Sequence, residues 1–377
     1  MKYCDAIEYV EVLPVYEETA KQGDSLRLLQ RLGEPQKELT FVYIEGTQGR
    51  ETIPAYVAMV LKCAGYKVGR YETNDVLEYR DHFQIGGRSI SMKGFCELVE
   101  RVKEVCEQMA AEGNQYPDAA EVSAAIAFLY FRQQGCDLVI LSEGAGSPGN
   151  IGKVIGDLDA VQKASVGEES ADFPKKVKHG LEKQRFDYKE FKGLEITLAG
   201  ARQVQNAVLA IEVLESLGRQ GYEISEKALR KGLFETKCPE CFSIIGKKPS
   251  FVVHGVYDVD AAAELVQSIE LYFAQKRILF IMGMAREAES EKIINMTHKY
   301  ADWIITVTSP GDSRALSSYE LAAEVAEVHP NVTAVDSAEE AAEISHLLAG
   351  KEDVIIAFGP VALIGRLMEI AKNRKLG

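Results

Sequence analysis

Histidine and positive charge are both scarce in this sequence, and their scarcity excludes several classes of function. The chain has 377 residues but only six histidines, which are dispersed, so it contains no multi-histidine metal motif and no Ser–His–Asp arrangement. Lys and Arg number 43 against 57 Asp and Glu, and the formal net charge of −14 argues against nucleic acid or an anionic membrane as partner. No hydrophobic run approaches a transmembrane span, and the acidic N-terminal segment is not a signal peptide.

Cysteines are scattered rather than arranged as a disulfide framework. The seven cysteines suit a reducing environment, so we expect a cytoplasmic protein with free thiols. Cys238 and Cys241 alone have CxxC spacing. Without a second such pair or nearby histidines, this spacing is a weak indication of zinc or redox chemistry. We therefore predict a linker turn with free thiols.

Length and pattern together predict two α/β domains. A chain of 377 residues exceeds one typical hydrophobic core. Strand-like apolar runs alternate with amphipathic helical patterns almost throughout. We expect a phosphate-loop domain with a mostly parallel sheet over residues 1–237 and a smaller Rossmann-like domain over residues 238–377. Between residues 152 and 189 the pattern becomes charged and loses definition, which indicates a loop or a reduced, rebuilt segment.

The apolar runs also predict where the main elements lie. Strands are expected at residues 41–44, 66–71, 136–141, 250–254, 277–283, 303–308 and 353–359. Helices are expected at residues 25–32, 91–109, 118–134, 203–217, 261–275 and 289–300. Asp118 after Pro117 is a typical N-cap signal for the third of these helices.

The segment after the first expected strand has the chemistry of a phosphate-binding loop. Gly46 and Gly49 permit a tight turn whose amide N–H groups face a phosphate. Thr52 opens the next helix, where its hydroxyl can hold Mg²⁺ and where the helix N-terminus adds positive potential. The predicted nucleotide-binding residues here are Gly46, Thr47, Gly49, Arg50 and Thr52. An ordinary strand–turn–helix joint is the alternative.

The charge of this loop is unusual. Arg50 stands where such loops carry a lysine, and its guanidinium is larger and planar, so the two are not equivalent. Glu51 adds a negative charge beside the expected anion, which weakens binding or requires a second metal. We expect an altered phosphate site in which Arg50 is a candidate catalytic residue.

Further candidate site residues lie after predicted strands or at the ends of predicted strands. Glu143 comes directly after the strand at 136–141 and is a candidate second Mg²⁺ ligand and catalytic residue; a surface glutamate in a Gly-rich loop is the alternative. Gln203 and Asn206 lie three residues apart on one helical face, where their amides could bind an adenine edge or simply decorate a helix start. His254 is expected to be partly exposed at a strand end.

Taken in order, these segments resemble folylpolyglutamate synthase, a member of the Mur ligase superfamily, nearly end to end. Residues 45–52 occupy the place of the family's AGTNGKGS loop, and Glu121 lies in the counterpart of its TxFE helix. Gly200, Gln203, Asn206 and Ala207 match its GxHQxxNA motif. The resemblance implies a Mur-ligase-like fold with ATP and Mg²⁺ as cofactors. It also implies that a folate-like carboxylate is phosphorylated and then attacked by the amine of glutamate.

Several family residues have changed in this chain. The loop lysine is Arg50, the family's metal-binding glutamate aligns with Ser142, and the DGAHNP motif reads 254–259 without its aspartate and histidine. Losing one electrostatic contact to a phosphoryl transition state costs about 3–4 kcal/mol, so ordinary family turnover is not expected unless relocated residues converge.

Three functions stay open. The first is an ATP-dependent carboxylate–amine ligase with an altered site. In that site Arg50 would hold phosphate, Thr52 and Glu143 the Mg²⁺, and Gln203 with Asn206 the adenine. The second is a catalytically inactive relative that binds a nucleotide or a partner protein. The third is a ligase that acts on another acidic substrate.

Overall fold

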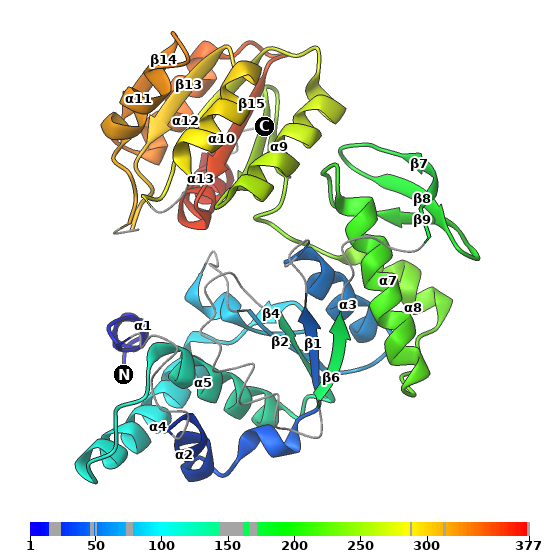
Figure 1. Ribbon diagram of the computed structural model, residues 1–377, viewed down its shortest axis with the longest axis vertical. Helices are drawn as coiled ribbons and strands as arrows, with labels where there is room; N and C mark the ends of the chain where they lie inside the picture. The colour runs from blue at the N-terminus through cyan, green and yellow to red at the C-terminus, as the bar shows by residue number, and fades with distance from the viewer. Residues whose placement is uncertain are drawn as a thin grey trace. The chain divides into compact units, whose positions relative to one another are not determined.

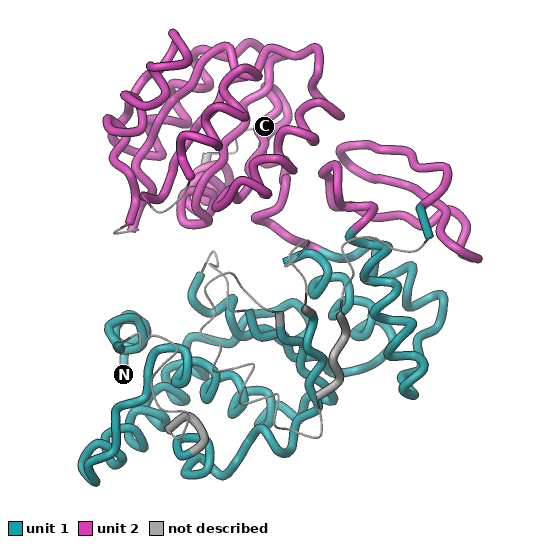
Figure 2. Tube along the Cα trace, viewed as in Figure 1, with its two compact units in different colours: residues 1–173, 206–236 teal, residues 174–205, 237–377 magenta. Residues whose placement is uncertain are grey.

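The computed structural model divides into two compact units, shown in different colours in Figure 2. The first comprises residues 1–173 and 206–236, and the second comprises residues 174–205 and 237–377. The structure describes residues 1–14, 24–45, 49, 51–72, 78–142, 161–165, 172–286, 289–311 and 314–374. In this described part, every helix is too short or too polar to cross a membrane.

The first unit is built on a six-stranded sheet with the strand order β4-β3-β2-β5-β1-β6. The strands are β1 (Phe41–Glu45), β2 (Val68–Tyr71), β3 (Phe83–Ile85), β4 (Arg88–Ser89), β5 (Leu138–Ser142) and β6 (Val161–Ser165). β2, β5, β1 and β6 are parallel, whereas β3 and β4 pair antiparallel at the other side. The carboxyl ends of the parallel strands therefore meet at one edge of the sheet, where ligands bind in open α/β sheets.

Helices cover both faces of this sheet (Figure 1). One face shares a buried apolar core with α1 (Tyr3–Glu11), α2 (Asp24–Arg31), α4 (Met92–Ala111) and α5 (Ala119–Gln134). On the other face, α3 (Thr52–Cys63) contacts β2 and β5 and packs against α8 (Glu226–Glu235). The two helices approach so closely that a Cβ on Gly232 would lie 2.4 Å from Cα of Val60. Glycine is needed there to admit the neighbouring backbone.

Local sequence signals explain how these elements begin and end. Asp118 caps α5 as predicted: its Oδ1 accepts the Glu121 N–H at 2.8 Å, and Glu121 Oε2 accepts the Asp118 N–H at 2.9 Å. Gly135 ends the same helix in the left-handed conformation. Glu121, the counterpart of the family's TxFE glutamate, therefore contributes to helix capping.

Of the two alternatives for residues 152–189, a loop or a rebuilt segment, the described residues do not form a loop. Residues 161–165 form β6, and β7 (Lys175–Lys178) and β8 (Gln184–Tyr188) join β9 (Phe191–Ile196) in an antiparallel sheet of order β7-β8-β9. β7 is mostly exposed and its pairing with β8 is irregular, so its sequence lacks apolar alternation. Phe186 and Tyr188 on β8 supply the buried side.

The second unit also contains a six-stranded sheet, of order β10-β11-β15-β12-β13-β14. Its strands are β10 (Ser243–Lys247), β11 (Ser250–Gly255), β12 (Ile278–Met282), β13 (Trp303–Val307), β14 (Val332–Val335) and β15 (Val354–Gly359). All neighbours pair in parallel except β10, which is antiparallel to β11. The helices are α9 (Val259–Phe273), α10 (Ser290–Thr297), α11 (Ser318–Ala326), α12 (Ala338–Leu348) and α13 (Val361–Arg374).

Alternate residues of these strands face two different apolar cores. Phe280 and Phe358 lie in the core shared with α9 and α10, whereas Ile281 and Ala357 lie in the core shared with α12 and α13. A strand that is buried on both faces has a continuous apolar sequence, which is why β11, β12, β13 and β15 were predicted while β10 and β14 were not.

Candidate functional site

The turn between β1 and α3 is tightly packed at Gly49. Its φ is +63°, and a Cβ there would lie 2.7 Å from Ile53 Cδ1 and 3.0 Å from Asn206 Cγ. The Gly49 carbonyl accepts the Ile53 N–H at 2.8 Å and so starts the first turn of α3. Glycine is required here both for backbone conformation and for space. Gly46, Thr47 and Arg50 lie outside the described residues.

Thr52 and Asn206, which are 154 residues apart in the chain, hydrogen-bond to each other in the first unit. Asn206 Nδ2 donates to Thr52 Oγ1 at 2.8 Å. Both side chains are buried, with exposed fractions of 2% for Thr52 and 3% for Asn206. Asn206 lies in α7 (Gln203–Arg219), so this bond fixes α7 to the first residue of α3.

This arrangement leaves the Thr52 hydroxyl with coordinating capacity. A hydroxyl oxygen has two lone pairs and one proton, so accepting the Asn206 amide occupies one lone pair and leaves one for a cation. The N-terminus of α3 lies at the carboxyl end of β1, where its first N–H groups attract anions. Asn206 therefore orients the predicted metal ligand, a role that the sequence did not indicate.

Gln203 forms its own contact within the second unit, to which the division of the chain assigns it. Its Nε2 donates to Glu264 Oε1 at 3.3 Å, and its buried Oε1 has no hydrogen-bond partner among the residues that the structure describes. Burial raises the pKa of the Glu264 carboxyl, while Arg202 and the Gln203 amide oppose this shift. The Gln203 carbonyl thus remains an available buried acceptor, and adenine binding by Gln203 stays a prediction.

The carboxyl end of β2 brings a further acidic residue to the sheet edge where β1 ends. β5 lies between β1 and β2, with Ser142 paired to Ile44 and Leu141 paired to Tyr71. Glu143 follows β5 but lies outside the described residues. Glu72 directly follows Tyr71, and its side chain is buried. Sequence reasoning missed Glu72, although an acid directly after a predicted parallel strand was the signal that singled out Glu143.

His254 is buried, with an exposed fraction of 6%, so the prediction of partial exposure is wrong. It is the penultimate residue of β11, and its Nδ1 accepts the backbone N–H of Phe242 at 3.1 Å. Burial lowers the pKa of His254 to about 4, against a smaller opposing effect from the backbone of Ala261. The ring is therefore neutral at pH 7 with its proton on Nε2. Asp258 caps α9 by accepting the Ala261 N–H at 2.8 Å.

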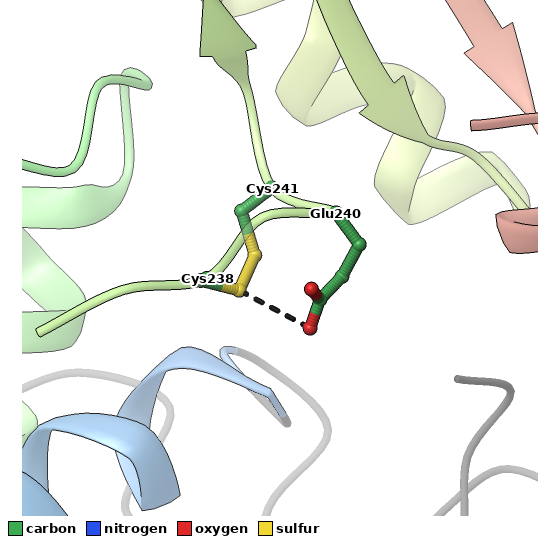
Figure 3. Close-up of side chains that lie close together, drawn as sticks. All are labelled: Cys238, Glu240 and Cys241. Carbon is green, nitrogen blue, oxygen red and sulfur yellow. Dashed lines mark hydrogen bonds between the residues drawn. A yellow bond between two sulfur atoms is a disulfide. The ribbon is translucent and has the colours of Figure 1, made fainter. Parts of the chain in front are cut away.

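Cys238 and Cys241 are joined in a disulfide, so the prediction that they are free thiols is wrong. Figure 3 shows the bond together with the side chain of Glu240, whose Oε1 lies 3.5 Å from Cys238 Sγ. The spacing allowed a bond, but only the turn geometry decides whether the two sulfurs meet.

Comparison with known proteins places this architecture in a class. Residues 242–361 match the family described as Mur ligase, glutamate ligase domain. The fold resembles folylpolyglutamate synthase of Thermotoga maritima with a TM-score of 0.81 and 22% identity, covering 100% of this chain and 98% of that chain. It also resembles Mycobacterium tuberculosis folylpolyglutamate synthase complexed with ADP and AMPPCP, with a TM-score of 0.82, 16% identity and the same coverage. The chain therefore has the fold of the folylpolyglutamate synthases, and its residues 242–361 are similar to the glutamate ligase domain of Mur ligases.

Proteins with a similar sequence include folylpolyglutamate synthases. The Lacticaseibacillus casei folylpolyglutamate synthase is 22% identical over 376 residues, which cover 84% of this chain and 87% of the relative. The Bacillus subtilis dihydrofolate synthase/folylpolyglutamate synthase is 22% identical over 331 residues, covering 72% and 77%. The predicted resemblance to folylpolyglutamate synthase and the predicted fold class are confirmed.

Proposed function

We propose that the protein is an ATP-dependent ligase of the folylpolyglutamate synthase type, with an altered phosphate site. It joins a carboxylate of a small, folate-like acid to the amine of glutamate. The observation that carries the proposal is the buried Asn206–Thr52 hydrogen bond beside Gly49, because it holds a hydroxyl at the start of α3 where a nucleotide-bound cation needs a ligand. The names of the relatives and the nucleotides bound to the similar M. tuberculosis structure support the same reaction class.

The described residues fit a magnesium nucleotide. In the first unit, Gly49 leaves no room for a side chain and Thr52 retains a lone pair. In the proposal Thr52 and Glu143 hold Mg²⁺, which neutralises phosphate charge. Arg50 binds the phosphates in place of a lysine, together with Gly46, Thr47 and Gly49. Gln203 contacts the adenine.

Asn206 is assigned a more specific role than binding adenine. Because one of its two amide N–H groups is committed to Thr52, it acts as a positioning residue for the metal ligand, and its amide oxygen and second N–H remain for a base edge. The substrates are small molecules, and we propose a cytoplasmic location from the acidic composition and the scattered cysteines.

Nucleotide titration followed by melting temperature tests the proposal first. A ligand at 100 times its dissociation constant stabilises the native state by about 2.7 kcal/mol, so ATP with Mg²⁺ should raise the melting temperature and chelation should reduce the shift. Arg50→Ala should abolish the shift, Arg50→Lys should retain it, and Arg366→Ala, which changes an exposed arginine of the second unit, should leave it unchanged.

Turnover is then measured as Mg²⁺-dependent ADP release in the presence of a folate-like acid and glutamate. Release that needs both substrates supports the ligase. ATP protection without turnover on any acidic acceptor would instead favour a catalytically inactive nucleotide-binding relative. No ATP effect on melting in the unmodified protein would contradict both interpretations.

A further inference from the structure

The turn that holds Cys238 and Cys241 is fixed by bonds other than the disulfide. The Cys241 N–H donates to the Cys238 carbonyl at 3.1 Å and closes the turn. The Gly255 N–H donates to the Glu240 carbonyl at 2.8 Å, and the Phe242 N–H donates to His254 Nδ1 at 3.1 Å, so the turn is fastened to the end of β11. These bonds do not involve sulfur. The two sulfurs therefore stay neighbours whether they are bonded or reduced.

We propose that Cys238 and Cys241 form a reversible thiol/disulfide pair that exchanges with small-molecule or protein dithiols and disulfides. In the forward step, the two thiols lose two protons and two electrons, and one S–S bond forms. An external disulfide such as oxidised glutathione takes up both electrons and both protons and is reduced to two thiols. The reverse step consumes two external thiols and restores the dithiol.

Glu240 keeps both end states electrically neutral at sulfur. Its carboxylate lies 3.5 Å from Cys238 Sγ, where it accepts the S–H of the reduced thiol. Both cysteines are buried, and a disulfide also carries no charge. Neither state therefore requires an unpaired charge in the interior.

The same cluster fits a structural metal less well. Among the residues that the structure describes, Cys238, Glu240 and Cys241 supply three ligand atoms within 4.8 Å of one another. Structural zinc sites close with four protein ligands. Nearby His254 cannot supply the fourth as it stands, because its Nδ1 accepts the Phe242 N–H and its Nε2 carries the proton. Two thiolates and one carboxylate would also leave a divalent ion with an excess negative charge in a buried turn.

The oxidation state of the pair affects the backbone of the segment that connects the two units. The chain passes from the first unit to the second between Thr236 and Lys237, directly before Cys238. The disulfide restricts the backbone of this connecting segment, and reduction releases that restriction. The other described buried cysteines cannot form such a pair, because Cys96, Cys106 and Cys136 have no second cysteine within three residues in the sequence.

Equilibration of the full-length protein in glutathione buffers, followed by differential alkylation and peptide mass spectrometry, tests the proposal. The oxidised-to-reduced ratio of the pair should change about tenfold for each tenfold change in [GSSG]/[GSH]², as an intramolecular two-electron exchange requires. Cys4, which is exposed, is the internal control and should not follow this dependence. Hydrogen exchange over residues 237–243 should be slower in the oxidised protein, while that of β12 should be unchanged.

Three outcomes would overturn the proposal. The first is a pair that stays reduced in oxidised glutathione, and the second is a single glutathione adduct on one cysteine that persists. The third is stoichiometric zinc that is retained by the reduced protein and lost in Cys241→Ser. The titration uses the unmodified protein and no nucleotide, so its result is independent of the ligase proposal.

Discussion

The Asn206–Thr52 hydrogen bond gives the sharpest prediction about this protein. Thr52→Val keeps the shape of the side chain but leaves the buried Asn206 amide without its acceptor, and Asn206→Leu leaves the Thr52 hydroxyl without its donor. A buried polar group that loses its partner costs about 1–3 kcal/mol, so each single variant should lose about that much unfolding free energy. For a unit of this size, each 1 kcal/mol lowers the melting temperature by roughly 2–4 °C.

The double variant should behave differently from the sum of the two singles. Replacing both partners by apolar groups of similar shape can be nearly neutral, so the double variant should recover about 1 kcal/mol or more of the summed loss. Unfolding in urea measures this coupling. Gln205→Leu changes a half-buried amide next to Asn206 and is the matched control, for which no coupling with Thr52→Val is expected.

Ligand binding adds a second measurement of the same bond. Because Asn206 orients the hydroxyl that holds the nucleotide-bound cation, Asn206→Leu should reduce the Mg²⁺-ATP melting shift more than the shift with ATP alone. Additive stability losses together with an unchanged Mg²⁺-ATP shift would refute the assignment of Asn206 as a positioning residue for Thr52.

Two other predictions follow from Gly49 and His254. Gly49→Ala should lower the melting temperature, and the rise in melting temperature that ATP causes, more than Gly135→Ala does. Both glycines have φ near +62°, but of the two only Gly49 faces atoms within 3 Å. Equal effects would show that crowding at Gly49 is unimportant. The pKa of His254 falls from 6.5 to about 4 on folding. The free energy of unfolding should therefore be unaffected by this residue above pH 6.5 and should decrease, by at most about 3 kcal/mol, as the pH falls toward 4. His254→Asn, which keeps an acceptor near the Phe242 N–H, should therefore show a flatter decline of unfolding free energy over this interval; parallel pH curves would contradict the shift.

Much of the fold could be predicted because the local sequence pattern of these elements agrees with their burial in the tertiary structure. β12 and β15 are buried on both faces, so continuous apolar runs mark them in the sequence. The Asp118–Glu121 capping box likewise places the start of α5 within one residue of the prediction. β7 went unnoticed because an exposed edge strand has no apolar face to mark it.

The site was less predictable because its contacts are long-range. Nothing local indicates that Asn206 bonds to Thr52, since the interaction depends on how α7 packs against α3. His254 is buried because β11 pairs with both β10 and β15, a fact of sheet order rather than of the neighbouring sequence. The Cys238–Cys241 bond depends on turn geometry that the CxxC spacing permits but does not determine.

The threading of the chain between its units has a practical consequence for anyone who wishes to dissect the protein. The polypeptide changes unit three times, after Phe173, Gln205 and Thr236. A recombinant fragment that starts at residue 238 would lack the β7-β8-β9 sheet, although this sheet is part of the second unit. A fragment that stops at residue 237 would contain the β7-β8-β9 sheet without the rest of the second unit. To express either unit alone, its two separate segments must be joined directly, because truncation at a single position does not separate the units.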